Sequence, residues 1–315
     1  MAKKTTIIIG SRGSELAMWQ SRFIKREIEK NNKTIKVEIK LISTKGDKIL
    51  DVALSKIGDK GLFTKELEVE LLNKTIDLAV HSLKDLQTDI PEGLKLAAVT
   101  KRHPAEDVLI ARRKGMTIQM LPEGAVVGTG SLRRRAQLLH VRPDIKIEEL
   151  RGNVPTRIKK FQDSDWDAII LARAGVERLS LKKNISFVIP IGQMLPAAGQ
   201  GALGIEIHKD NKFVEEILKS IHDEPAYLAV LAERSFLKSL EGGCQAPIGA
   251  FAEIKSNGIY LDGIVASIDG SITFRKKIRG KKNEAEKLGS RLAQDLKEAG
   301  ADRVLEEIYE TVRIK

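Results

Sequence analysis

Short apolar runs alternate with amphipathic patterns over the first two thirds of the chain. The run over 7–9 ends at Gly10, and apolar residues at helical spacing over 16–28 follow, with Ser14 as the expected N-cap. A period-two stretch over 35–41 then predicts a half-buried strand. The same alternation continues with a helix over 64–73 and strands over 76–80 and 94–99.

A second block with this pattern begins after Pro104. Its predicted strands cover 108–111, 126–127, 146–150 and 168–171, and its helices lie near 131–140 and 154–161. Strands that alternate with helices are typical of an α/β fold with a mostly parallel sheet, and two such blocks predict two similar lobes. The polar, glycine-punctuated stretch over 43–62 predicts a long loop, and loops of this length are usually functional or mobile.

The last hundred residues follow a different pattern. Helices are predicted near 211–221 and 225–239, followed by strands over about 248–254, 259–268 and 271–279 and a helix over 284–299. Asn257-Gly258 and Asp269-Gly270 are strong hairpin-turn signals between these strands. This part is therefore expected to form a separate α+β domain.

Composition and charge narrow the possible functions. The 315 residues suffice for two or three domains, and 54 Lys and Arg against 43 Asp and Glu give a net charge of +11, which suggests an anionic partner. Aromatic residues make up only 4%, which argues against a stacking platform for single-stranded nucleic acid. We expect neither a transmembrane helix nor a signal peptide. The single cysteine, Cys244, excludes an intrachain disulfide and a Cys-based zinc cluster, and it fits a reducing compartment.

Glycine turns that open helices are the first candidate for a binding site. Gly-Thr-Gly-Ser at 128–131 leads from a strand into a helix that starts with three arginines at 133–135, so N–H groups, hydroxyls and guanidiniums converge where an anion could bind. A capped helix with a solvated basic face is the alternative. Gly-Ser-Arg-Gly-Ser at 10–14 makes a similar turn in the first lobe. Further arginines lie near strand ends, where ligands bind in open α/β sheets, although each alone could serve solubility: Arg151, Arg157, Arg173 and Arg178.

Two other places carry reactive groups. The run 81–85 follows a strand and places Lys84 beside Asp85, a pair that can hold a charged carboxylate in a cleft or can be an ordinary surface ion pair. His81 is interpreted as a structural residue that satisfies a hydrogen bond. Cys244 follows a helix end and two glycines, on a loop open to close approach, with a small buried thiol as the alternative. No Cys/His pair is indicated, so a protease-type nucleophile is not expected.

Seven motifs in one order resemble a known family, the hydroxymethylbilane synthases, also called porphobilinogen deaminases. They cover about residues 7 to 250, and the cysteine motif is the most diagnostic. The motifs are Gly10-Ser11-Arg12-Gly13-Ser14, Lys60-Gly61-Leu62-Phe63 with Lys65-Glu66, His81-Ser82-Leu83-Lys84-Asp85, Gly128-Thr129-Gly130-Ser131 with Arg133-Arg134, Arg151-Gly152-Asn153, Pro196-Ala197-Ala198-Gly199-Gln200-Gly201-Ala202 and Glu241-Gly242-Gly243-Cys244-Gln245.

The resemblance implies a transferase of tetrapyrrole biosynthesis. Such an enzyme joins four porphobilinogen molecules head to tail, releases ammonia at each step and then frees the linear tetrapyrrole by hydrolysis. A covalent dipyrromethane cofactor, held as a thioether on Cys244, would prime the chain and stay behind after product release. The family expectation for the oligomeric state is a monomer, and for the location the cytoplasm.

The implied fold consists of two periplasmic-binding-protein-like lobes with two crossing segments and a small α+β third domain that carries the cysteine. The expected boundaries place 1–100 and 200–219 in lobe 1, with the catalytic aspartate and the lid loop 43–62. They place 105–195 in the arginine-rich lobe 2 and 222–315 in domain 3.

By matching position, the resemblance assigns a role to each site residue. Asp85 would be catalytic, hydrogen-bonding pyrrole nitrogens and stabilising the cation formed as ammonia leaves. Lys60 would help to close the loop over the cleft. The expected cofactor-binding residues are Cys244, Lys84, Ser131, Arg133, Arg134 and Arg157, and the expected substrate-binding residues are Arg12, Ser14, Lys60, Arg151, Arg178 and Gln200, with no metal ligand.

The chain departs from the family pattern at two positions. Gln87 stands where the family usually has proline, which loosens the loop after Asp85 without removing a chemical group. Arg173 stands where many relatives carry an uncharged residue, so its role stays open.

Two other classes of protein compete with the enzyme. A solute-binding protein would use the same two-lobed cleft but gives no role to Asp85 or Cys244. A nucleic-acid binder would account for the positive charge, but it needs a recognition helix or aromatics among the basic residues, and neither is found. The enzyme is therefore expected to have porphobilinogen as its partner, with no nucleic acid and no membrane.

Overall fold

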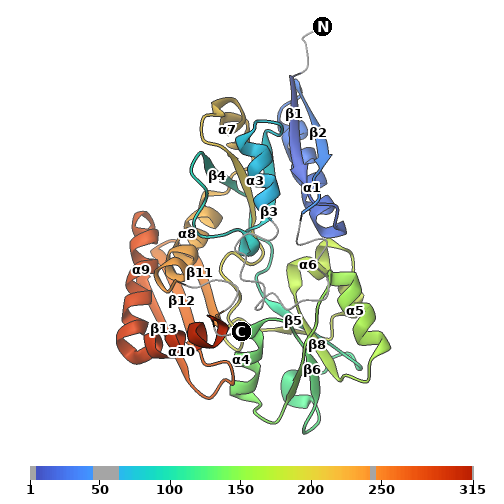
Figure 1. The fold of residues 1–315 in the computed structure, drawn as a ribbon, viewed down its shortest axis with the longest axis vertical. Coiled ribbons are helices and arrows are strands. Elements are labelled where there is room, and N and C mark those ends of the chain that lie inside the picture. Colours follow the sequence, from blue (N-terminus) through green and yellow to red (C-terminus); the bar gives the residue numbers. More distant parts are fainter. Residues whose placement is uncertain (1–4, 45–63, 242–245, 314–315) are drawn as a thin grey trace. The chain divides into compact units, whose positions relative to one another are not determined.

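The computed structural model describes residues 5–44, 64–241 and 246–313, which form two compact units (Figure 1). Of these residues, the first unit contains 5–44, 64–103 and 202–227, and the second contains 104–201, 228–241 and 246–313. Within the described residues, the chain passes between the units three times. The domain boundaries expected from the sequence, which separate 222–315 as a third domain, stay a prediction. Lys60 and Cys244 lie outside the described residues.

The first unit is built on a five-stranded sheet in the order β2-β1-β3-β10-β4. Its strands are β1 (Thr5–Ser11), β2 (Ile35–Leu41), β3 (Leu78–Ser82), β4 (Leu94–Val99) and β10 (Leu203–His208). Four of these strands run in the same direction, as expected for a mostly parallel sheet, whereas β10 runs antiparallel to both of its neighbours. The hydrophobic pattern did not predict β10 as a strand.

Helices cover both faces of this sheet because neighbouring strand residues point to opposite sides. Ile7 and Ile9 of β1 share one core with α1 (Glu15–Asn31) and α7 (Lys212–Leu218), while α3 (Lys65–Leu72) packs in another core with Ala79 of β3. The N-cap predicted for α1 is confirmed, since the Ser14 side chain accepts a hydrogen bond from the backbone N–H of Ala17.

The second unit repeats this topology. Its sheet has the order β7-β6-β8-β5-β9, in which β5 is the reversed strand. The strands are β5 (Asp107–Ala111), β6 (Val126–Gly128), β7 (Lys146–Glu148), β8 (Ala168–Ala172) and β9 (Phe187–Ile189). One face is covered by α4 (Leu132–Val141), and the other by α5 (Val154–Asp163) and α6 (Arg173–Arg178). The predicted pair of similar α/β lobes is confirmed.

A three-stranded antiparallel sheet also belongs to the second unit. It consists of β11 (Ile248–Lys255), β12 (Gly258–Ala266) and β13 (Thr273–Gly280). Both predicted hairpin turns are confirmed by the strand registers and by Gly258 and Gly270, which have positive φ. The small α+β part expected at the end of the chain is therefore present.

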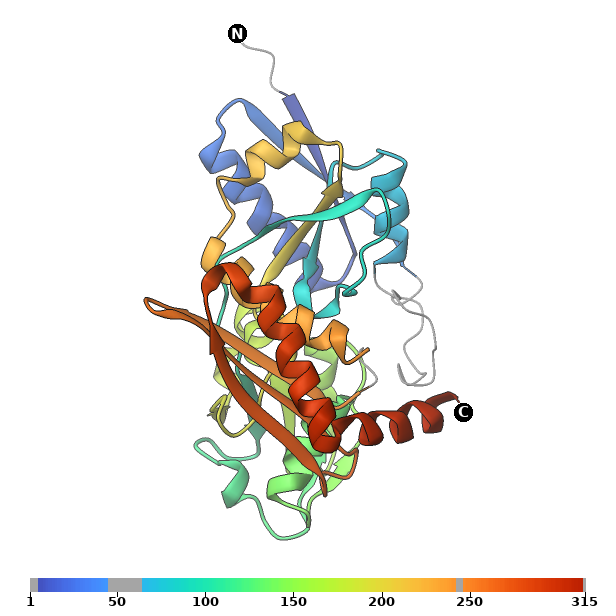
Figure 2. The ribbon, with the colours of Figure 1, turned by 90° about the vertical axis from the view of Figure 1, so that its left-hand side faces the viewer.

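Helices α8 (Glu224–Ser239), α9 (Ala285–Leu296) and α10 (Asp302–Arg313) accompany this sheet, and α9 packs across β12 and β13 (Figure 2). A Cβ on Gly289 would lie 2.3 Å from the carbonyl oxygen of Ala232, so glycine lets α9 approach the backbone of α8. The sequence pattern predicted a single helix over 284–299 and missed α10. This helix follows Gly300, whose backbone has a left-handed conformation. Among the described helices, none combines the length and apolar character needed to span a membrane.

Candidate functional site

A pocket of about 70 Å³ opens at one edge of the first unit's sheet. It forms where β1 turns into α1 and where β3 ends, because the carboxyl ends of parallel strands meet at one edge. Its polar lining comes from Arg12, Ser14, Gln20, Thr64, His81, Ser82 and Asp85. The sequence-predicted residues Arg12, Ser14 and Asp85 are thus brought together.

Asp85 lies on a single helical turn, Leu83–Asp85, directly after β3. Leu83 is buried and anchors this turn: its N–H donates to the carbonyl of Ala202, and its side chain fills the space over Gly204. Asp85 is exposed at the pocket, and Lys84 beside it is half-buried. The turn therefore presents a carboxylate at the sheet edge on a rigid base.

A buried polar layer lies behind this carboxylate. His81 Nε2 lies 3.0 Å from Oε2 of Glu206, a side chain with no exposed surface, which confirms the interpretation of His81 as hydrogen-bonded. Gln20 donates from Nε2 to Oγ of Ser82 at 2.6 Å. Burial raises the pKa of Glu68 on α3, and the charge of Glu206 adds to this rise. The sequence analysis missed Gln20 and Glu206, although a single glutamate within the apolar run 203–207 is a signal for a buried charge.

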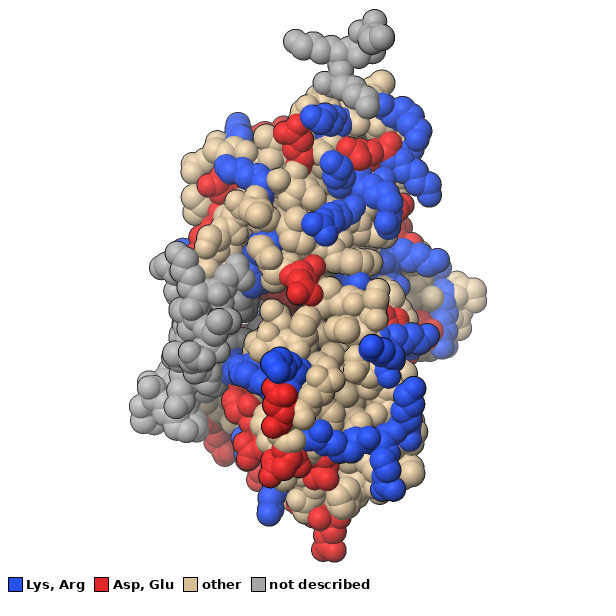
Figure 3. Space-filling model, turned by 90° about the vertical axis from the view of Figure 1, so that its right-hand side faces the viewer, with Lys and Arg blue, Asp and Glu red and all other residues tan. Residues whose placement is uncertain are grey.

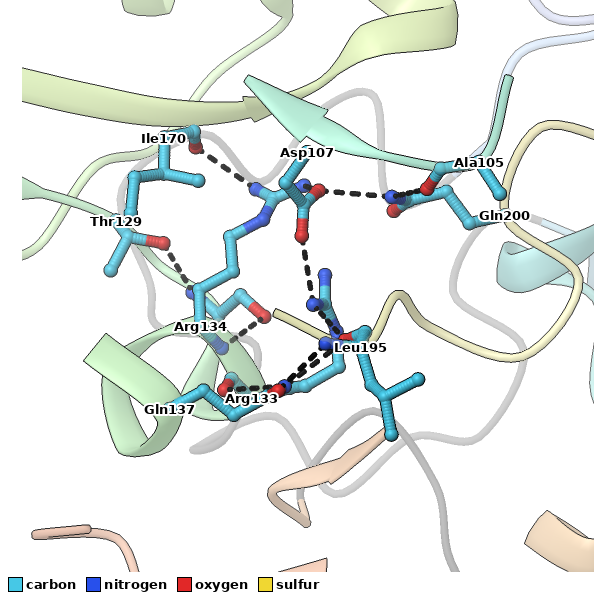
Figure 4. Close-up of polar contacts among 10 residues, drawn as sticks. Ala105, Asp107, Thr129, Arg133, Arg134, Gln137, Ile170, Leu195 and Gln200 are labelled. Atoms are coloured by element: carbon cyan, nitrogen blue, oxygen red, sulfur yellow. Dashed lines mark hydrogen bonds and ion pairs between the residues drawn. The ribbon is translucent and has the colours of Figure 1, made fainter. Parts of the chain in front are cut away.

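The second unit gathers two guanidiniums around one carboxylate (Figure 4). Asp107, the first residue of β5, has no exposed surface. Its Oδ2 accepts a hydrogen bond from Nη1 of Arg133 and its Oδ1 one from Nη2 of Arg134, both at 2.8 Å. Gln200 donates from Nε2 to the same Oδ1 at 2.9 Å. The predicted ligand residues of α4 and Gln200 therefore meet at a residue that the sequence analysis did not single out.

The balance of charge at this cluster favours an anionic ligand. Burial alone would raise the pKa of Asp107, but Arg133 and Arg134 outweigh it and hold this pKa well below its usual range. Two buried guanidiniums and one carboxylate leave an excess positive charge, and Nε of Arg134 has no hydrogen-bond partner among the described residues. A solvated basic face is therefore the wrong interpretation for Arg133 and Arg134, each 5% exposed, while Arg135 is exposed.

Ser131 caps α4, as its side chain accepts a hydrogen bond from the N–H of Arg134. The turn before it lies against the end of β7, since a Cβ on Gly130 would come within 2.8 Å of the carbonyl oxygen of Leu150. Arg151 is close by and pairs with Glu149 at 2.5 Å. The glycine turn and Arg151 thus share one corner of the second unit.

The three other arginines that the sequence analysis singled out in this unit contact backbone carbonyls or acidic side chains. Arg157 donates from Nε to the carbonyl of Gly152 at 2.7 Å, and Arg178 donates to the carbonyl of Gly201 at the same distance. Burial lowers the pKa of Arg178 to about 10, so it stays charged at neutral pH. Arg173, whose role was left open, forms ion pairs with the acidic residues Glu106 and Glu177.

Side chains of both signs lie on the face that Figure 3 shows. Lysine and arginine side chains are numerous there, with aspartate and glutamate side chains among them.

Comparisons with known proteins identify the family of this chain. The profile described as "Porphobilinogen deaminase, dipyromethane cofactor binding domain" matches residues 7–216, and "Porphobilinogen deaminase, C-terminal domain" matches residues 227–298. The porphobilinogen deaminase of Carboxydothermus hydrogenoformans is 52% identical over 305 residues, which are 97% of this chain and 98% of the relative. That of Chloroherpeton thalassium is 47% identical over 309 residues, again 97% and 98% of the two chains.

Solved structures with partial similarity include two binding proteins. The methionine binding protein MetQ covers 71% of this chain and 90% of its own, with a TM-score of 0.44 and 14% identity. A TRAP periplasmic solute binding protein from Desulfovibrio salexigens covers 99% of this chain and 80% of its own, with a TM-score of 0.41 and 9% identity.

Proposed function

The chain belongs to the porphobilinogen deaminase family, and on that premise we propose that its two units divide the work of the reaction between them. The enzyme polymerises porphobilinogen, joining four molecules head to tail with loss of ammonia and then releasing the linear tetrapyrrole by hydrolysis. In our proposal the pocket of the first unit stabilises the cation formed as ammonia leaves. The arginines of the second unit bind the carboxylates of substrate and cofactor.

Asp85 is the catalytic residue in this proposal. When the C–N bond of the protonated aminomethyl group breaks, ammonia leaves with the electron pair, and the remaining methylene-pyrrole cation shares its charge with the ring nitrogen. A carboxylate held beside that N–H stabilises the cation more than the neutral ring, which is the condition for a faster reaction. Asp85 meets the requirement of rigidity, because buried Leu83 anchors its turn under β10.

The residues at Asp107 fit the family's dipyrromethane cofactor. When bound, this group supplies the pyrrole to which the first substrate is joined. The excess buried positive charge and the unpartnered Nε of Arg134 suit its acetate and propionate groups. We assign its binding to Lys84, Ser131, Arg133, Arg134 and Arg157, and its thioether attachment to Cys244.

Substrate carboxylates are assigned to a second set of residues. Each porphobilinogen carries two carboxylates, so a growing chain needs many cationic partners, and the net charge of +11 is in keeping with this need. The set consists of Arg12, Ser14, Lys60, Arg151, Arg178 and Gln200.

The observation that carries the proposal is the Asp107 cluster, because a buried excess of positive charge requires an anionic partner. Intact-protein mass spectrometry tests it on protein from cells that make porphobilinogen. We expect the wild type to carry the added mass of two linked pyrroles and Cys244→Ser to be folded, unmodified and nearly inactive. An unmodified wild type, or a fully active Cys244→Ser variant, would contradict the proposal.

The state of the enzyme in the cell is also a proposal. We propose a cytoplasmic monomer that binds porphobilinogen and neither nucleic acid nor membrane, with the three-domain boundaries given above. Size-exclusion chromatography with light scattering tests the oligomeric state. A mass near twice 34.9 kDa at micromolar concentration would contradict the monomer.

A further inference from the structure

A fully buried glutamate, Glu233 on α8, bridges two backbone segments that are distant in sequence. Its Oε2 accepts a hydrogen bond from the N–H of Gly199, and its Oε1 accepts one from the N–H of Ala252 on β11, both at 2.7 Å. Glu233 therefore ties the segment 195–200 to the three-stranded sheet.

The same segment is held at its other end by α4. Gln137 pairs with the backbone of Leu195 in both directions: it donates to the carbonyl at 3.0 Å and accepts from the N–H at 2.7 Å. Arg133 donates to the same carbonyl at 2.7 Å while it contacts Asp107. The position of the Arg133 guanidinium thus depends on where Leu195 lies.

Between these ends, the segment is joined to both neighbours. The carbonyl of Pro196 accepts from the N–H of Ala250 at 2.9 Å, and Ala198 packs in the core of the three-stranded sheet. Gln200 donates to Asp107 and, at 2.7 Å, to the carbonyl of Ala105. The segment 195–200 is consequently a strut with direct bonds to the Asp107 cluster on one side and to β11 and α8 on the other.

The chain order gives this strut a role. Helix α8 ends at Ser239 and β11 begins at Ile248, so Cys244 lies between the two elements that Glu233 ties together. We propose that Glu233 is a positioning residue. It acts through the strut to fix the positions of α8 and β11, the two elements that flank the cofactor cysteine, relative to Arg133 and Arg134. This inference rests on the proposed function, because it requires the cofactor to be attached at Cys244.

Carboxylate chemistry explains why a glutamate serves here. Its two oxygens accept the two N–H donors at once, whereas a glutamine in the same place would accept one and direct its own NH₂ group at the other. A buried N–H left without an acceptor weakens the structure around it. The strut should therefore loosen in Glu233→Gln with almost no change in side-chain volume.

The test measures cofactor attachment on folded protein. Apo forms of wild type, Glu233→Gln and the control Glu253→Gln, an exposed glutamate on β11, are mixed with porphobilinogen well below their melting temperatures. Intact mass then follows the rate of pyrrole addition. We expect at least a tenfold slower rate for Glu233→Gln and less than a twofold change for Glu253→Gln.

A second variant covers the case in which Glu233→Gln does not fold. Gln137→Leu removes both side-chain bonds to Leu195 without changing the charge, and we expect it to slow attachment in the same direction. If the folded variants attach the cofactor at the wild-type rate, whatever their melting temperatures, Glu233 is merely structural and the inference is wrong. If the wild type itself adds no pyrrole, the proposed function fails instead.

Discussion

The two five-stranded sheets have the same strand order, but the charges buried beside them are opposite. The first unit buries Glu68 and Glu206 with His81, whereas the second buries Arg133 and Arg134 with Asp107. The shared topology supplies a sheet edge where a ligand can bind, and the side chains placed there set the chemistry. The same topology thus carries two different sets of buried ionisable side chains.

The reversed strand shows how this difference arises. Asp107 is the first residue of β5 and is paired with Ala172 at the very end of β8, within reach of the start of α4. Glu206 lies three residues into β10, opposite Ala79, where its observed partner is His81 of the neighbouring strand. The position of a buried carboxylate along the reversed strand therefore determines which side chains it contacts.

The strongest test of the comparison removes the charge from the first unit's pocket. Asp85→Asn keeps the shape of the side chain but should lower single-turnover rates of the holoenzyme by about a thousandfold, the upper range for losing one preorganised electrostatic group. Asp85→Glu keeps the charge and misplaces it by about 1 Å, which should cost about a hundredfold. Normal turnover by Asp85→Asn would assign the carboxylate role to another residue.

The second test removes charge from the other unit. Arg133→Leu or Arg134→Leu leaves Asp107 short of a partner and removes a carboxylate ligand, which should cost on the order of 3 kcal/mol in ligand binding. Arg135→Leu, on the exposed side of α4, should change little. Cofactor loading by intact mass and the length of enzyme-bound intermediates measure the effect. Equal, small effects at all three positions would restore the solvated-face interpretation.

A smaller effect is expected from the helix caps that the two units share. Ser14→Ala and Ser131→Ala each remove a side-chain acceptor at the start of a helix, which typically costs about 1 kcal/mol of stability. Asn153→Ala, at the cap of α5, is the matched control outside the assigned ligands. Urea unfolding gives the stability of each variant, steady-state kinetics gives the substrate KM for Ser14→Ala, and intact mass gives the cofactor loading of Ser131→Ala. If KM and cofactor loading change no more than they do for Asn153→Ala, the two serines serve as caps and bind neither substrate nor cofactor.

The smallest expected effect is a pH dependence of opposite sign in the two units. The folded state raises the pKa of Glu68 above its ordinary value of 4.5. Protonated Glu68 therefore contributes fully to the free energy of unfolding below pH 4.5, and this contribution is lost as the pH rises through the folded-state pKa. The pKa of Asp107 is lowered, so its contribution is present above 3.8 and is lost only in stronger acid. Between pH 5 and 7, Glu68→Gln should therefore gain stability relative to wild type.

Glu70→Gln on the same helix is the control for this pH test. Lys40 and Thr75 lower the pKa of Glu70, so its replacement should not gain stability over the same pH interval. Urea unfolding at both pH values measures the difference for each variant. A flat difference for Glu68→Gln would show that its carboxylate is ionised in the folded protein throughout this range.

The sequence by itself predicted features that depend on near neighbours. Hydrophobic periodicity located most helices and strands, because it records which residues of one element share a face. The cap at Ser14 and the hairpin turn at Asn257-Gly258 were readable for the same reason. The order of the motifs predicted the family, which the comparisons confirm, and it led to the proposed roles of Asp85, Arg133 and Arg134.

Tertiary structure alone decided which buried charges meet. Asp107 contacts Arg133 across 26 positions, Glu233 contacts Gly199 across 34, and His81 contacts Glu206 across 125. No local pattern predicts these pairs, because each joins elements that only the folded chain brings together, and two of them involve the reversed strands β5 and β10. A carboxylate can be buried only where a matching donor or cation is already held, and the folded topology supplies that partner.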